Sequence, residues 1–170
     1  QPLEKAKGFY ASQYQGDLNW DAIAADGYTY AHLRASSGWR PLPSGSRKIG
    51  FHKDTRFDRN WHGAGSVGMI RTVWHYLVQP LNGQAGDFHN VLAGRVPEAG
   101  YYLDLEENDL TNEKCKRALD ACDRHFDTIT GAYFNLNFAN KRQPIPWATH
   151  ESGALRPLWL GAWTTSQNPI

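Results

Sequence analysis

The stretch YYLDLEE at residues 101–107 runs from apolar side chains into carboxylates. Side chains of a β-strand alternate between the two faces of a sheet, so Asp104 and Glu106 point the same way, with Cα atoms about 6.6 Å apart. Glu107 points the other way or begins a loop. Parallel α/β sheets and barrels place functional side chains at the carboxyl ends of their strands. The stretch therefore predicts a strand over residues 100–105, with two neighbouring carboxylates at its carboxyl end and at a site-forming edge.

Apolar runs on both sides of this stretch predict further strands. They cover residues 8–12, 29–35, 67–76, 129–134 and 158–163. Apolar residues at helical spacing predict helices between them, over residues 20–25, 57–64, 84–92 and 111–126. A loop rich in Gly, Pro and Ser, residues 36–50, is long enough to be functional. The alternation is typical of parallel βα units, but it does not separate an open doubly wound sheet from a barrel.

The length of 170 residues predicts a single domain over residues 1–170. A closed eight-unit α/β barrel usually needs about 250 residues and rarely fewer than about 200. A barrel in this chain is therefore expected to be abbreviated or incomplete.

Charge and composition exclude several classes of protein. Lys and Arg total 18 against 17 Asp and Glu, without a basic block, which disfavours nucleic acid as the partner. No apolar run approaches the roughly 20 residues of a membrane span, and residues 1–7 lack a signal-peptide core. Cys115 and Cys122 are expected to be buried thiols. Seven Trp and eight Tyr offer flat faces that suit sugar rings as well as a core.

The carboxylate pair suits acid–base chemistry. Mutual repulsion and burial can raise one pKa towards neutrality, and glycosidases use such pairs. The alternative is a solvated strand end that feeds an acidic loop. His75, at the end of another strand, is expected near Asp104, either hydrogen-bonded within the protein or in contact with substrate. The histidines show no metal-ligand spacing, so we expect no metal.

Several short motifs follow one another in a specific order. They are GFYASQYQG at residues 8–16, NW at 19–20, YAHLRAS at 30–36, DxxFxxNW at 54–61, WHY at 74–76, LDLE at 103–106, GAY at 131–133 and LWLGAW at 158–163. In this order they resemble the family 25 glycoside hydrolases, the lysozymes (N-acetylmuramidases) of bacteria, phages and fungi. The resemblance covers nearly the whole chain.

The resemblance implies an abbreviated (β/α) barrel of the (β/α)5(β)3 type, incomplete at its C-terminal strands. It implies cleavage of the β-1,4 bond between N-acetylmuramic acid and N-acetylglucosamine in bacterial peptidoglycan, without a metal or organic cofactor. Glu106 matches the general acid/base, and Asp104 matches a partner that stabilises positive charge or orients an acetamide group. The residues expected to bind substrate are Tyr10, Arg34, His75, Tyr76, Tyr133, Asn135 and Trp163.

Two departures from the family separate the possible functions. Tyr10 stands where the family has a first-strand Asp, and the late-strand acid is missing. We expect the Tyr10 hydroxyl to bind the acetamide group instead. The alternatives are a catalytically impaired glycan-binding or virion structural domain, a chitinase-like hydrolase and, last, a metal-dependent deacetylase.

The resemblance also carries expectations about surroundings. It implies a secreted, extracellular or phage-encoded protein. Because an unpaired strand edge is costly and prone to association, a partner, an additional domain or further sequence is expected to cover the C-terminal edge, unless the fold closes compactly.

Overall fold

The computed structural model describes residues 6–38 and 51–161. Its strands are Gly8–Ala11 (β1), Tyr30–Ser37 (β2), His52–Lys53 (β3), Ile70–Tyr76 (β4), Tyr101–Asp104 (β5), Gly131–Asn135 (β6) and Leu158–Gly161 (β7). Its α-helices are Trp20–Ala25 (α1), Phe57–Ser66 (α2), Gln84–Leu92 (α3), Asn112–Phe126 (α4) and Leu136–Lys141 (α5). Two short 3-10 helices cover Gln13–Gln15 (η1) and Pro146–Ala148 (η2).

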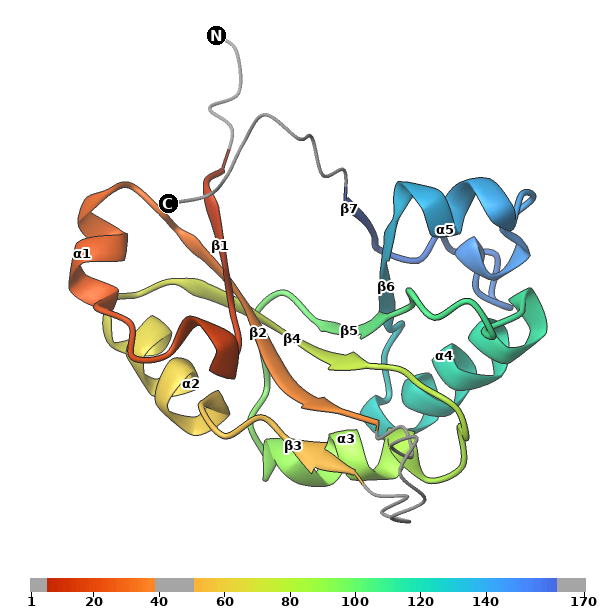
Figure 1. Cartoon of the computed structure of the whole chain (residues 1–170), viewed down its shortest axis with the longest axis horizontal. Helices are drawn as coiled ribbons and strands as arrows, with labels where there is room; N and C mark the ends of the chain where they lie inside the picture. Colours follow the sequence, from red (N-terminus) through yellow and green to blue (C-terminus); the bar gives the residue numbers. More distant parts are fainter. Residues whose placement is uncertain (1–5, 39–50, 162–170) are drawn as a thin grey trace, which may run out of the picture.

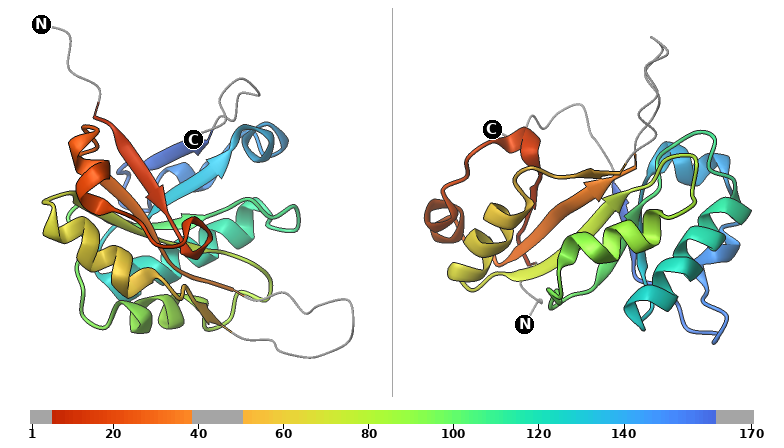
Figure 2. Two further views of the ribbon diagram at one scale, coloured as in Figure 1. Left: turned by 60° about the vertical axis from the view of Figure 1, so that its left-hand side comes forward. Right: turned by 90° about the horizontal axis from the view of Figure 1, so that it is seen from below.

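The strands form one curled sheet in the order β1-β2-β4-β5-β6-β7. All pairs along this path are parallel, and β3 adds to β2 antiparallel. The sheet makes a half-barrel with α1 to α4 on its convex side, and the concave side opens between β1 and β7 (Figures 1 and 2). The expectation of an abbreviated (β/α) barrel is confirmed.

The expected elements match the observed ones closely, with two exceptions. The strand expected over residues 67–76 begins at Ile70, because α2 continues to Ser66 and Gly68 turns the chain with a positive φ of 74°. Neither β3 nor α5 was expected from the sequence. Most of the expected functional loop, residues 39–50, lies outside the described residues.

Two layers of side chains flank the sheet. Between the sheet and the helices lies an apolar core that includes Leu33, Phe88, Leu103 and Leu119, all fully buried. The expected buried thiols, Cys115 and Cys122, belong to this layer and are unpaired. None of the helices in the described ranges is long and apolar enough to cross a membrane.

The concave side of the sheet is filled by aromatic rings. His32 of β2 lies 4.2 Å from Trp159 of β7 and 5.9 Å from Trp74 of β4, measured between ring centroids. Burial lowers the pKa of His32 to about 3, so this imidazole is neutral. Ring contacts therefore bridge β2 and β7 across the concave side, although these two strands do not pair through their backbones.

A buried ion-pair network fixes the segment that leads into β7. Arg156 is 4% exposed and donates to Asp120 at 3.0 Å and to Asp123 at 2.7 Å. It also donates to the carbonyl of Thr130 at 3.1 Å. These contacts join β7, and with it Trp159, to α4.

Candidate active site

Asp104 ends β5 on the concave face of the sheet. Its register neighbours are Tyr76 on β4 and Tyr133 on β6, so three polar side chains lie side by side. Asp104 is 3% exposed, and its Oδ1 atom accepts no hydrogen bond from the described part of the chain. Burial, together with the negative charge of Glu106, raises the pKa of Asp104 well above its usual value, and Arg34 opposes this. The alternative of a solvated strand end is therefore wrong for Asp104.

Glu106 follows two residues later, in the loop after β5, and is half-buried. The side-chain amide of Asn135 donates from Nδ2 to its Oε1 at 2.9 Å. Asn135 is the last residue of β6 and the N-cap of α5. The ends of β5 and β6 thus bring the amide of Asn135 to Glu106, two residues after Asp104.

Tyr10 on β1 reaches the same group of acids. Its ring stacks on Trp74, with centroids 4.9 Å apart, and the side chain remains 38% exposed. Burial raises the pKa of Tyr10, and the charges of Asp104 and Glu106 add to the increase. The phenol is therefore neutral, and the charges of both carboxylates act on it.

Arg34 is tied to the protein at one end of its guanidinium. Nε donates to Oδ2 of Asp54 at 2.7 Å, and both side chains are buried. The guanidinium also lies 4.6 Å from the ring centroid of Tyr14. Its Nη2 is buried and finds no acceptor among the described residues. Arg34 therefore supplies positive charge to the site and retains one donor that could meet a ligand.

Two tyrosines border Asp104. Tyr76 donates its hydroxyl to Oε1 of Glu107 at 2.6 Å. The Tyr133 hydroxyl lies against Gly161, where a Cβ would overlap it. Trp163, also expected in the groove, lies outside the described residues.

Comparison with known proteins places this arrangement in a known fold. The endolysin ply40 catalytic domain from bacteriophage P40 of Listeria monocytogenes is 19% identical, with a TM-score of 0.65 over 84% of this chain and 69% of that one. A family GH25 lysozyme from Aspergillus fumigatus is 19% identical, with a TM-score of 0.66 over 97% of this chain and 80% of that one. The fold is that of the family 25 glycoside hydrolases.

The similarity in sequence covers less of this chain than the similarity in fold does. Lysozyme M1 of Streptomyces globisporus is 29% identical over 70 residues, which are 41% of this chain. The match spans only 20% of that lysozyme's length. No family model matches the sequence.

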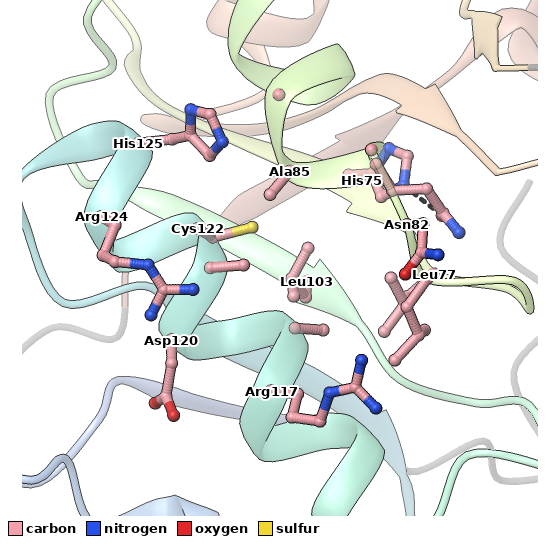
Figure 3. Close-up of a pocket in the computed structure, with 16 residues that line it drawn as sticks. His75, Leu77, Asn82, Ala85, Leu103, Arg117, Asp120, Cys122, Arg124 and His125 are labelled. Atoms are coloured by element: carbon pink, nitrogen blue, oxygen red, sulfur yellow. Dashed lines mark hydrogen bonds between the residues drawn. The ribbon is translucent and has the colours of Figure 1, made fainter.

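His75 does not lie with Asp104 and Glu106. It is fully buried, bonded through Nδ1 to Ser36 and through Nε2 to Gln84, both at 2.8 Å. Burial lowers its pKa to about 4. His75 borders a cavity of about 330 Å³ between α3 and α4, on the helix side of the sheet (Figure 3). The expectation that it contacts substrate is corrected, because strand alternation that turns Tyr76 towards the site turns His75 away.

Sequence reasoning missed several residues of the concave face. Asp54, the first residue of the DxxFxxNW motif, was not predicted as a site residue, although it anchors Arg34. The rings of His32, Trp74 and Trp159 line the same face, and strand alternation was the signal that could have found them. Over residues 6–38 and 51–161, no group of three or more His, Cys, Asp or Glu side chains could hold a metal ion.

Proposed function

We propose that this protein is a peptidoglycan hydrolase, a muramidase that cleaves the β-1,4 bond between N-acetylmuramic acid and N-acetylglucosamine. The observation that carries the proposal is the pair Asp104 and Glu106 at the carboxyl end of β5, one buried with a raised pKa and one held by an amide. The shared fold with a family GH25 lysozyme and a phage endolysin supports it.

Glu106 is assigned as the general acid/base. It protonates the leaving oxygen as the glycosidic bond breaks and then accepts a proton from the attacking water. Its loop position, half-buried and beside the Tyr10 phenol, leaves it accessible to a glycan from the open side of the half-barrel.

Asp104 is assigned the assisting role. Its Oδ1 has no hydrogen-bond donor in the described chain, and burial makes the ionised form costly. A substrate acetamide N–H and the positive charge of an oxocarbenium-like transition state would both stabilise that ionised form. Because the charge develops only during reaction, this interaction favours the transition state over the bound substrate.

Tyr10, Arg34, Tyr76, Tyr133 and Trp163 are proposed to bind the glycan. The Tyr10 hydroxyl is placed to hydrogen-bond the acetamide, which would compensate in part for the first-strand Asp of the family. Bacterial peptidoglycan is the proposed partner. The protein is proposed to be secreted or released by a phage. A further domain or partner at the edge of β7 remains part of this proposal.

A second candidate function is a glycan-binding or virion structural domain without turnover. The observation that favours it is Tyr10 itself, because one carboxylate of the family's site is replaced by a neutral phenol. Digestion of purified peptidoglycan, with mass spectrometry of the products, separates the readings. Fragments with reducing N-acetylmuramic acid ends support the muramidase, saturable binding without fragments supports the binding domain, and cleavage of chitin oligomers alone supports a chitinase-like hydrolase.

A further inference from the structure

Helix α5 contacts the acidic loop after β5 at both of its ends. We infer that α5 is the positioning element of the site, in which Asn135 holds the Glu106 side chain and Arg142 holds the backbone of the loop that carries it. The inference rests on the proposed function of Glu106, but its geometric part can be tested without any substrate. It also changes the expected role of Asn135 from binding substrate to positioning.

The amide of Asn135 makes two hydrogen bonds in opposite directions. Its Oδ1 accepts from the backbone N–H of Phe138 at 2.8 Å, which caps the first turn of α5. Its Nδ2 donates to Oε1 of Glu106 at 2.9 Å. Because the cap needs the oxygen, the amide cannot flip without losing it. The cap therefore keeps an N–H directed at Glu106.

The body of α5 is anchored in the protein. Phe138 is 2% exposed and packs near Phe134 of β6, with ring centroids 6.4 Å apart. The guanidinium of Arg142 lies 3.9 Å from the centroid of the Phe138 ring. Phe138 thus packs the six-residue helix, with Asn135 and Arg142 as its two caps, against β6.

Arg142 binds the loop through its carbonyl groups. Nε donates to Leu110 at 2.6 Å, and Nη2 donates to Asn108 at 2.8 Å and to Glu107 at 3.3 Å. The contacts span the residues immediately after Glu106. The loop is thus fixed by a planar fork on one side while the Glu106 carboxylate is fixed on the other.

Two fixed points restrict both the position and the direction of the Glu106 carboxylate. Proton transfer to a leaving oxygen depends steeply on orientation, and a displacement of about 1 Å can cost about 10²-fold in rate. Supporting contacts of this kind decide whether an acid is productive. Loss of α5 contacts should therefore reduce kcat while glycan binding is retained.

The first experiment separates capping from positioning. Asn135→Asp and Asn135→Ser both keep an oxygen that caps a helix, but neither has an amide N–H for Glu106. We expect each to lower kcat on peptidoglycan about 10- to 100-fold, with KM within about twofold of wild type. Melting temperatures should stay within about 3 °C of wild type.

The matched control is Asn19, which caps α1 in the same way. Its Oδ1 accepts from the N–H of Ala22 at 3.1 Å, and Asn19 is exposed. Asn19→Asp and Asn19→Ser are expected to leave kcat unchanged. Equal kcat in wild type and both Asn135 variants would overturn the inference. A raised KM with kcat retained would overturn it as well.

Arg142 is tested by the exchange for a lysine. Arg142→Lys keeps the charge but cannot make the fork to three carbonyls. We expect a loss in kcat of about 10-fold or more, with KM retained. Unchanged kcat would remove Arg142 from the inference.

The second experiment needs no activity. In the nuclear magnetic resonance spectrum, the side-chain N–H signals of Asn135 should move on Glu106→Ala, while those of Asn19 stay in place. If wild type proves inactive on peptidoglycan, the proposed function fails and this shift alone decides the positioning claim. If the Asn135 signals stay in place on Glu106→Ala, the positioning claim is overturned.

Discussion

Tyr10 and Trp74 lie with ring centroids 4.9 Å apart and their planes at 30°. The Tyr10 phenol on β1 is neutral, and it feels the charges of both Asp104, at the end of β5, and Glu106, in the loop after it. The ring belongs to the aromatic filling of the half-barrel, whereas the hydroxyl belongs to the site. The two contributions can be separated by removing the hydroxyl alone.

Tyr10→Phe is expected to lower kcat/KM on peptidoglycan about three- to tenfold, the value of one hydrogen bond to the acetamide. The free energy of unfolding should stay within about 0.5 kcal/mol, because the ring and its stack remain. Tyr28→Phe is the control, since Tyr28 packs on Phe9 away from the acids. Unchanged turnover of Tyr10→Phe would refute the role of the hydroxyl.

Asp104 should make the protein less stable as pH rises. Burial and the charge of Glu106 raise the folded-state pKa of Asp104 above its unfolded value near 3.8. Between these two pKa values the folded state binds more protons than the unfolded state, so the free energy of unfolding falls with increasing pH. Asp104→Asn removes this fall.

Urea denaturation of wild type and Asp104→Asn at several pH values between 3 and 7 measures the effect. The two proteins should be equally stable near pH 3, and the variant should become the more stable one as pH rises, while its turnover is lost. A variant that is less stable than wild type at pH 7 would contradict the raised pKa.

His75 is expected to contribute to stability and not to turnover. His75→Gln loses at least one buried hydrogen bond, to Ser36 or to Gln84, at a cost of about 1–3 kcal/mol in the free energy of unfolding. The kcat on peptidoglycan should be unchanged at a temperature where the variant is folded. Full stability with lost turnover would return His75 to the substrate-binding residues.

Acid should destabilise the protein through the same buried imidazole. The folded-state pKa of His75 is about 4 against 6.5 in the unfolded chain, so stability is lost as pH falls from about 6.5 towards 4. The loss from this group is at most about 3 kcal/mol. A ring-proton titration that finds His75 charged at pH 5.5 would contradict its burial as the cause.

Arg156→Met is expected to reduce the free energy of unfolding by about 3–5 kcal/mol, because the substitution leaves Asp123 without its buried partner. Arg124→Met is the control, because Arg124 is exposed on helix α4 next to Asp123. It should change the free energy of unfolding by no more than about 0.5 kcal/mol. Chemical denaturation of the two variants measures both values. Similar small losses in both would show that the network does not hold β7.

The long elements could be predicted because their apolar residues are buried where the periodicity places them. The strand expected over residues 29–35 is buried along most of β2, and the apolar stripe of α4 includes Cys115 and Leu119. Helix α5 was not predicted because its only signals are one capping Asn and the apolar Phe138, within less than two turns. The two-residue β3 depends on pairing with Ser36 and Ser37, which no local pattern reveals.

The site was predictable only as far as one strand determines it. Alternation along the expected strand predicts that Asp104 and Glu106 share a face, whereas β5 ends at Asp104 and Glu106 lies in the loop after it. The bond from Asn135 to Glu106 joins residues 29 positions apart and depends on where β5 and β6 end. His75 was expected at the site because it lies near a strand end, but the register aligns its neighbour Tyr76 with Asp104.

The release of reducing ends from purified peptidoglycan by wild type and Glu106→Gln tests the central claim most directly. Glutamine fills nearly the same space and can still accept from Asn135, but it cannot give or take the catalytic proton. We predict that wild type releases reducing ends and that Glu106→Gln, folded with the same melting temperature, releases at least about 10²-fold fewer per unit time. Equal release by the two proteins would contradict the assignment of Glu106.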